Sequence, residues 1–230
     1  MSNWLFDYLH FSDEITGLAD EWLQRGNAGR GACYMIAGVV AHAERVAARA
    51  AAGIDVSRIA CRAGCPHCCV LSVSALIPEV AAIADYLRFS LDVDGVARLR
   101  GRIRDVRRRI RWVDPEERRL MGVACPFLDS TGACMVHPVR PLTCRGITST
   151  DPARCRQALA TLDPDEAATV EMNLLHKYLM DEAYRGVARA LERRRLDSRG
   201  VELVAGVGTF LDNRHLLDQF MAGGKVDFSD

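Results

Sequence analysis

The feature that most constrains this chain is the spacing of its cysteines. Eight of the nine fall in two segments, residues 61–69 and 125–155. Thiolates three or four residues apart on a turn can converge on one centre, and soft sulfur ligands select zinc or iron–sulfur clusters. The sequence therefore predicts a buried metal centre whose candidate ligands are Cys61, Cys65, Cys68, Cys69, Cys125, Cys134, Cys144 and Cys155.

Two other interpretations of the cysteines compete with metal binding. They could be small core side chains, but the four in residues 61–69, flanked by Gly64 and Pro66, follow neither a helical nor a strand period. They could form disulfides, which would require export. Residues 1–7 contain no basic segment followed by an apolar one. We therefore expect a cytoplasmic protein, and in a reducing cytoplasm this spacing favours metal binding.

Length and composition indicate one globular unit. The 230 residues are long for one domain and short for two, and 49% of them are apolar. We expect a single domain over 1–230, with a cysteine-cluster core at 58–157 and helical extensions at 1–57 and 158–230. No apolar run approaches the ~18 residues that cross a bilayer, so we expect no membrane association.

The formal net charge of zero argues against general nucleic-acid or membrane-surface affinity. Eight arginines nevertheless lie between residues 98 and 111, within a predicted helix. They form either a surface for an acidic partner or RNA, or a solvated face paired with acids on neighbouring helices, and the neutral charge favours the second. We expect no nucleic-acid partner. A protein partner or substrate stays open, and no oligomeric state is predicted.

The rest of the chain has mostly helical periodicity. Apolar residues at steps of three and four predict helices over about 14–24, 32–52, 78–87, 94–113, 163–195 and 209–221. Asp94 is expected to cap the fourth, Asp163-Pro164 to start the fifth, and Gly53 to stop the second. Cys33 falls inside the second helix, where we expect it to pack in the core.

Short β structure is expected near the cysteines. Residues 70–75 are β-prone, and residues 125–136 suggest two short strands around an Asp-Ser-Thr-Gly turn, which would bring Cys125 and Cys134 together. The predicted fold class is therefore mainly α: a single helical domain wrapped around an irregular cysteine-rich metal centre, with at most a short β-hairpin.

Four motifs occur in the order found in a known family. They are Cys61-x3-Cys65-x2-Cys68-Cys69, Cys125-Pro-Phe-Leu, Cys134-Met-Val-His and Arg140-Pro-Leu-Thr-Cys144-Arg145. In these motifs residues 58–157 resemble the YkgJ-like cysteine-cluster (CxxCxxCC) proteins, described as a zinc- or iron-chelating domain. The first gap is three residues instead of the commoner two, and His137 replaces the usual tyrosine, which places a nitrogen donor near the centre. The resemblance implies metal binding and leaves the metal and the activity open.

The choice of metal depends on how the eight thiolates are distributed among metal sites. Eight can fill two zinc sites, or one four-cysteine cluster and a second site. The adjacent side chains of Cys68 and Cys69 diverge, so they should serve different centres or different irons. Arg140 and Arg145 suit a cofactor of net negative charge, although they could equally brace backbone carbonyls. We favour an iron–sulfur cluster, with zinc or iron ions as the alternative.

The histidines are weaker candidate ligands. His67 and His137 lie next to cysteines and are candidates for an additional ligand. The others have no second ligand four residues further on, so we expect core or surface roles for His10, His42, His176 and His215.

Whether the protein is an enzyme is left open. Some relatives in the family are flagellin lysine methylases, which implies that cluster-dependent, methyltransferase-like modification of a protein is conceivable. The Gly206-Val-Gly208 pair lacks the context of a nucleotide site and is expected to be a loop. The spacing of Cys61, Cys65 and Cys68 also matches radical S-adenosylmethionine enzymes, but helices dominate both sides of it. Two further functions are a metal-binding protein with a redox or metal-handling role, and a structural zinc module that presents the arginine-rich helix to a partner.

Overall fold

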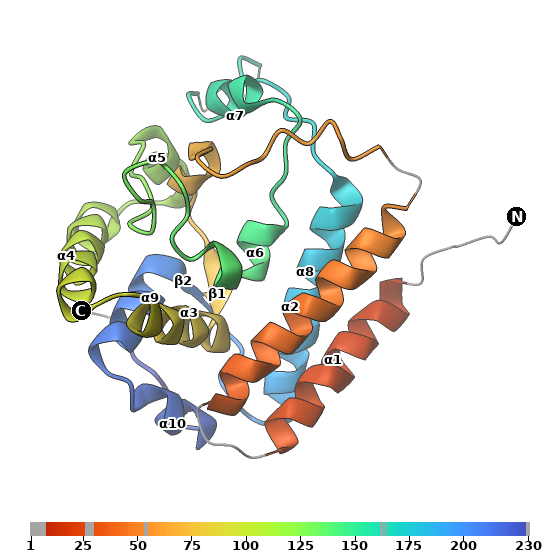
Figure 1. Ribbon diagram of the computed structural model, residues 1–230, viewed down its shortest axis with the longest axis vertical. Coiled ribbons are helices and arrows are strands. Elements are labelled where there is room, and N and C mark those ends of the chain that lie inside the picture. The colour runs from red at the N-terminus through yellow and green to blue at the C-terminus, as the bar shows by residue number, and fades with distance from the viewer. Residues whose placement is uncertain (1–7, 26–29, 53–54, 162, 164, 229–230) are drawn as a thin grey trace, which may run out of the picture.

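The computed structural model describes residues 8–25, 30–52, 55–161, 163 and 165–228. Over these residues the fold is mainly helical, as the sequence predicts, with one two-stranded sheet (Figure 1). The helices are α1 (Tyr8–Gln24), α2 (Arg30–Ala50), α3 (Ile77–Ser90), α4 (Val93–Ile110), α5 (Pro115–Leu120), α6 (Leu142–Arg145), α7 (Pro152–Ala158), α8 (Leu174–Arg193), α9 (Leu203–Asp212) and α10 (Leu216–Met221). The strands are β1 (Ser74–Leu76) and β2 (Gly200–Glu202), and two short 3-10 turns are η1 (His67–Val70) and η2 (His137–Val139).

Helices α1, α2 and α8 pack together on one side of the molecule (Figure 1). Their apolar stripes supply core residues such as Ile15, Val39 and Ala183, all fully buried. A Cβ at Gly186 of α8 would lie 2.6 Å from Ile15 Cγ2, so glycine permits the close approach of α1 and α8. This unit leaves the cysteine segments to be held by other elements.

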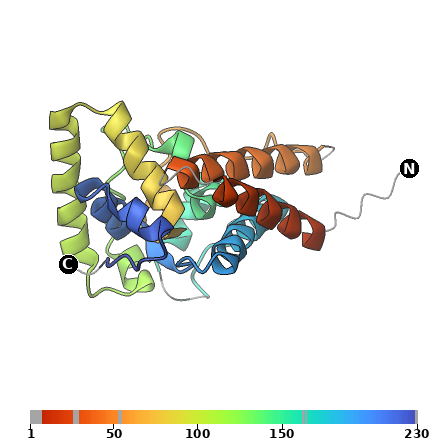
Figure 2. The same ribbon diagram turned by 90° about the horizontal axis from the view of Figure 1, so that it is seen from below.

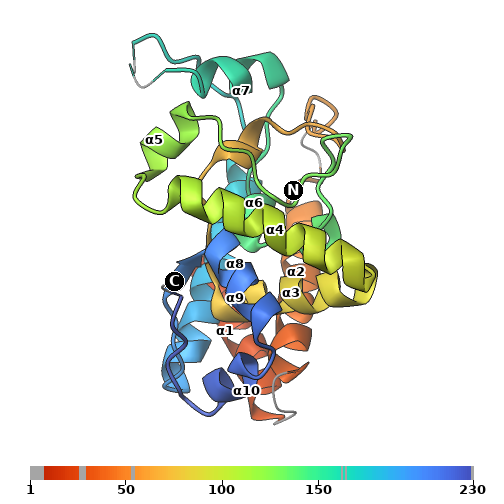
Figure 3. The same ribbon diagram turned by 90° about the vertical axis from the view of Figure 1, so that its left-hand side faces the viewer.

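Helix α9 packs between α3 and α4 (Figure 3). Figure 2 shows α4 on the opposite side of the molecule from α1 and α2. Gly206 and Gly208 lie within α9, not in the predicted loop. A Cβ at Gly206 would be 2.8 Å from Val80, and one at Gly208 would be 2.9 Å from Ile103. The glycine pair therefore serves close helix packing.

The sheet joins segments that are far apart in sequence. β1 pairs antiparallel with β2, with Ser74 opposite Glu202, so the β-prone segment forms a strand slightly later than predicted. The two strands expected in residues 125–136 are reduced to a single bridge between Leu128 and Cys134. The Asp129 carboxylate accepts the N–H groups of Thr131 (2.8 Å) and Ala133 (3.0 Å), and this tight turn replaces a longer ladder.

The predicted helix over 163–195 starts too early. Helix α8 begins at Leu174 and is capped by Asn173, whose side chain accepts the His176 N–H. The Asp163 carboxylate accepts the Asp165 N–H at 2.9 Å, and its carbonyl accepts the N–H groups of Glu166 and Ala167 at 3.2 and 2.9 Å, which makes a local turn. Pro164 lies outside the described residues. The chain before α8 instead bonds to an earlier loop, with the Thr150 N–H donating to the Glu171 carbonyl at 3.2 Å. These contacts outweigh the local helix-start signal.

Other helix boundaries also differ from the prediction. The helix predicted over 209–221 is two helices, α9 and α10, separated where Asn213 accepts the His215 N–H at 3.0 Å. Helix α4 is capped by Asp92 and not by Asp94. Helices α5, α6 and α7 were not predicted, although α5 and α7 each begin at the proline of an Asp-Pro pair whose aspartate is the N-cap. The proposed stop at Gly53 lies outside the described residues.

The arginines of α4 are largely used within the molecule. Arg102 donates to the Leu128 carbonyl at 2.8 Å and Arg107 to the Phe228 carbonyl at 3.1 Å. Arg100 bonds to the Leu211 carbonyl and lies 2.9 Å from the Asp212 carboxylate. The arginine-rich face thus braces neighbouring backbone as well as pairing with acids. In the described part of the chain, no helix is both long and apolar enough to span a membrane.

Candidate metal centre

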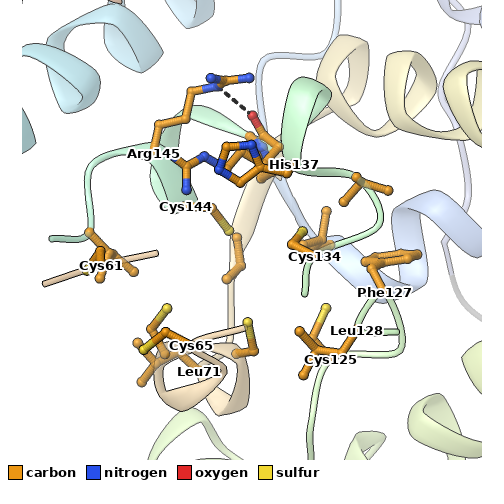
Figure 4. Close-up of a pocket in the computed structure, with 18 of the residues that line it drawn as sticks. Cys61, Cys65, Leu71, Cys125, Phe127, Leu128, Cys134, His137, Cys144 and Arg145 are labelled. Carbon is orange, nitrogen blue, oxygen red and sulfur yellow. Dashed lines mark hydrogen bonds between the residues drawn. The ribbon is translucent and has the colours of Figure 1, made fainter. Parts of the chain in front are cut away.

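Seven cysteines from both segments line one cavity of about 310 Å³. Figure 4 shows the sulfurs of Cys125, Cys134 and Cys144 pointing into the same space. All nine cysteines are free thiols, so the structure contains no disulfide. The cysteines that line the cavity are Cys61, Cys65, Cys68, Cys69, Cys125, Cys134 and Cys144.

Backbone contacts hold the two cysteine segments together. The turn η1 presents Cys68 and Cys69, and the Cys125 N–H donates to the Cys69 carbonyl at 2.8 Å. Gly64 and Gly132 both have positive φ, +83° and +80°, which glycine adopts without strain. A Cβ on Gly132 would lie 3.4 Å from the Gly64 carbonyl oxygen, so the two turns are in contact. The loops on either side of the cavity are therefore packed directly on one another.

A buried carboxylate positions the helix that carries Cys144. Glu79, in the first turn of α3, is only 1% exposed and accepts the N–H groups of Leu76 and Leu142, both at 2.8 Å. Burial raises the pKa of Glu79 to about 7, and these two N–H bonds oppose the rise. Leu142 begins α6, so Glu79 fixes the start of the turn on which Cys144 lies.

Cys155 lies on α7 and does not line the cavity itself. It nevertheless lies near Cys61, since burial raises the pKa of Cys61 and the charges of Cys68, Cys65 and Cys155 raise it further. The Ala60 N–H donates to the Ser149 carbonyl at 2.8 Å, and the Cys61 thiol reaches the same carbonyl at 3.8 Å. The start of the first segment is thus tied to the loop that leads into α7.

The mutual effects of the thiols divide them into two groups. Burial raises the pKa of Cys144, and the charges of Cys125, Cys68 and Cys134 raise it further. Burial also raises the pKa of Cys125 to about 12, with a contribution from Cys134. We call Cys69, Cys125, Cys134 and Cys144 the inner group, and Cys61, Cys65 and Cys155 the outer group.

Cys68 lies between the two groups. A hydrogen bond from the Cys69 thiol lowers the pKa of Cys68, and the same bond raises the pKa of Cys69. The charge of Cys68 also acts on Cys61 and on Cys144. Cys68 therefore adjoins both groups, and counting it with the outer group gives four thiols on each side.

The two predicted cofactor arginines have different surroundings. Arg145 donates from Nε to the Arg140 carbonyl at 2.8 Å and from Nη2 to the Pro138 carbonyl at 2.6 Å, and it pairs with Glu44. It therefore braces the loop. Arg140 lines the cavity, and its buried Nε has no hydrogen-bond partner. The hydrogen bond from Cys69 lowers the pKa of Cys68 and the charge of Arg140 adds to this, whereas burial raises the pKa of Cys134 and the charge of Arg140 opposes the rise.

Two histidines line the cavity, and one was not expected there. Burial lowers the pKa of His137, and the nearby charges of Arg140 and Arg145 lower it further, which favours the neutral ring that binds metals. His176 of α8 also lines the cavity and donates from Nε2 to the Arg145 carbonyl at 2.9 Å. Because it lies in a helix without cysteines, no sequence signal points to it.

The remaining candidates lie elsewhere. His67 begins η1 and is not among the cavity-lining residues. Cys33 lies in α2, half-buried, where burial raises its pKa to about 11, with a smaller contribution from Asp85. Cys33 thus stands apart in a helix as the sequence suggests.

The donor set fits a thiophilic metal centre. The cavity is lined by seven thiols, soft donors of the kind that bind zinc or iron–sulfur clusters. In the portion of the chain that the structure describes, no three His, Cys, Asp or Glu side chains are already gathered closely enough to hold a single ion.

Comparison with known proteins agrees with this chemistry. Residues 60–167 match the family model CxxCxxCC, described as a “putative zinc- or iron-chelating domain”. A search of curated proteins and a search of solved structures each found no match. The matched range contains all eight clustered cysteines and excludes Cys33.

Proposed function

We propose that this chain, whose residues 60–167 match the CxxCxxCC model of a zinc- or iron-chelating domain, holds an iron–sulfur cluster in a redox or metal-handling role. The observation that carries the proposal is the convergence of seven thiols from two distant segments on one cavity. Zinc or iron ions bound by the same thiolates are the alternative cofactor.

The inner group is the first candidate for the cluster. Its thiols come from the turn η1 (Cys69), the segment that carries Cys125 and Cys134, and the short helix α6 (Cys144). Four thiolates are the ligand set of a common iron–sulfur cluster, and the inner group has four thiols. Such a cluster, when bound, would supply one-electron chemistry.

The outer group, completed by Cys68, is the second candidate site. The Cys69 thiol donates a hydrogen bond to Cys68, so the two side chains do not diverge as the sequence suggested. We assign Cys68 to the outer site because its charge acts on Cys61, and Cys69 to the inner one because Cys125 and Cys134 act on it. This assignment also gives each site four thiolates, the number that closes a structural zinc site or ligates a cluster.

Charge supports an anionic cofactor. Four thiolates around a dication or a cluster leave net negative charge, and Arg140 supplies a cation beside Cys68 and Cys134. Arg145 acts indirectly by holding the Arg140 carbonyl. We assign Arg140 to the cofactor and Arg145 to the support of its loop.

One observation favours a second candidate, a cluster-dependent enzyme that modifies a protein side chain. The cavity extends beyond the thiols to apolar residues, among them Ile59, Leu71 and Val204, and its volume of about 310 Å³ is at the lower end of ligand pockets. Titration with S-adenosylmethionine tests this role. An unchanged metal-centre spectrum would count against it.

The decisive experiment is elemental analysis of protein purified under reducing, oxygen-poor conditions. We expect iron and acid-labile sulfide, with broad absorption near ~400 nm. Stoichiometric zinc without sulfide would replace the cluster with zinc sites. Protein that binds neither metal after reconstitution would contradict the proposal.

A further inference from the structure

Arg118 is a buried cation at the wall of the cysteine cavity, outside every cysteine motif. It lies on α5, its side chain is 3% exposed, and it lines the cavity. Its Nη1 donates to Glu202 Oε1 at 2.7 Å. Its Nε is shielded from solvent and has no hydrogen-bond partner. A buried N–H without an acceptor requires an explanation, of which an absent ion is one.

The Nε of Arg118 is one of four buried side-chain nitrogen and oxygen atoms without a hydrogen-bond partner among the described residues. Among the described residues, the buried side-chain nitrogens and oxygens without a hydrogen-bond partner are the Nε atoms of Arg100, Arg118, Arg140 and Arg189. Arg100 Nε is 2.9 Å from the Asp212 carboxylate and so has an ionic partner. Arg118 and Arg140 are the two of the four that line the cysteine cavity. Two of the four unpartnered Nε–H donors therefore belong to arginines that line the same cavity as the thiols.

Both arginines line the cavity together with all four thiols of the inner group. They come from different elements, since Arg140 is the C-cap residue of η2 and Arg118 lies in α5. The inner group is thus approached by two guanidinium groups.

Glu202 holds the Arg118 guanidinium in place. Its other oxygen accepts the Ala205 N–H at 2.8 Å, which caps α9, and Glu202 itself pairs with Ser74 in the sheet. The Arg118 side chain is therefore anchored through Nη1 to a rigid element. Its Nε remains available to a partner that the protein itself does not supply.

We propose that Arg118 donates its Nε–H to a sulfur of the metal centre held by the inner group. The inference rests on the proposed function. Arg118 is a positioning residue: an N–H···S bond withdraws charge from the sulfur, stabilises the ligated thiolate and raises the reduction potential of a cluster.

The test compares Arg118→Met, Arg118→Lys and Arg189→Met in the full-length, metal-loaded protein. Arg118→Lys keeps a cation that can pair with Glu202 but places no N–H at the Nε position. Arg189→Met removes another arginine with a buried, unpartnered Nε, one that bonds to Ser12 outside the cavity. The readouts are the rate of metal transfer to a chromogenic chelator, the thiolate-to-metal charge-transfer band and the melting temperature.

We expect Arg118→Met and Arg118→Lys to release metal about 10–100-fold faster than wild type, with a shifted charge-transfer band. We expect Arg118→Lys to keep most of the thermal stability, and Arg189→Met to release metal at the wild-type rate. Arg118→Lys that releases metal as slowly as wild type would overturn this inference alone. Wild-type protein that cannot be loaded with metal would overturn the proposed function and this inference together.

Discussion

The carboxylate of Glu79 accepts the backbone N–H of Leu142 at 2.8 Å, across 63 residues of sequence. Its other oxygen accepts the Leu76 N–H at the same distance. One buried side chain thus joins the end of β1, the start of α3 and the helix that carries Cys144. Glu79 therefore belongs to the support of the candidate centre, although it is no ligand.

Replacing Glu79 by glutamine should destabilise the fold. An amide offers one acceptor oxygen to two N–H donors, and a buried donor left unpaired costs about 1–3 kcal/mol. We expect a lower urea midpoint and faster metal release, since the first turn of α6 loosens. The exposed Glu21→Gln, which removes only a surface pair with Arg25, is the control and should change neither value.

The same residue predicts a pH dependence of stability. Burial raises the pKa of Glu79 from 4.5 to about 7, so the folded state binds this proton more tightly than the unfolded state. Its contribution to the free energy of unfolding is therefore complete below pH 4.5 and is lost as the pH rises to about 7. The loss is on the order of 2–3 kcal/mol. The difference in unfolding free energy between wild type and Glu79→Gln, measured at pH 5 and pH 8, should shrink at the higher pH. A constant difference would show that Glu79 is already ionised at pH 5.

The turn pair Gly64 and Gly132 gives a third prediction. Both have positive φ, so alanine at either position adopts a strained backbone that costs about 1–2 kcal/mol. Gly132→Ala also brings its Cβ to 3.4 Å from the Gly64 carbonyl oxygen. We expect each variant to unfold at lower urea and to lose metal more readily.

Gly17→Ala is the matched control for the glycine variants. Gly17 lies in α1, and a Cβ there meets nothing within 4 Å. Alanine should stabilise this helix by about 0.5–1 kcal/mol and leave metal binding unchanged. Metal loss in Gly17→Ala comparable to that in Gly132→Ala would mean that the measured loss reflects handling and not the cysteine turns.

Periodicity predicted the parts of the fold that bury a continuous stripe. Ile83 and Leu87 of α3, and Leu99 and Ile103 of α4, were expected at the helical interface and are buried. Local helix-start signals were less reliable: Asp163 forms a turn because the following chain bonds to the loop at Thr148–Thr150. Long-range contacts decide such segments, and a single sequence does not reveal them.

The candidate site was predictable as a set of ligands but not as a structure. Cysteine spacing alone identified the seven cysteines that line the cavity, because the ability to bind a soft metal follows directly from the residue type. Glu79, Arg118 and His176 were not found, because each lies on a helix of ordinary composition and reaches the site only through tertiary packing. The ligand assignment itself stays a prediction.

Cys33 and Cys144 should respond oppositely to serine substitution. Cys33→Ser places a hydroxyl in a half-buried helical position away from the cavity, at a cost of about 1–3 kcal/mol, and should leave the metal content unchanged. Cys144→Ser removes an inner-group thiolate and should lower the metal content by a whole centre. Because a bound metal contributes on the order of 10 kcal/mol to folding, it should also lower the melting temperature sharply. Loss of metal in Cys33→Ser with retention in Cys144→Ser would refute the assignment.

Cys155 and His137 compete for a place among the ligands, and the two groups of thiols separate their roles. Cys155 acts on Cys61, a member of the outer group, whereas His137 lines the cavity beside Arg140 and Arg145. If the outer group holds its own centre through Cys61, Cys65, Cys68 and Cys155, then Cys155→Ser should halve the metal content and spare the inner centre. His137→Gln, which keeps a polar side chain but lacks the imidazole, should retain both centres. Metal analysis and charge-transfer absorption of the two variants decide between them: full metal in Cys155→Ser together with loss in His137→Gln would move the fourth ligand from sulfur to nitrogen.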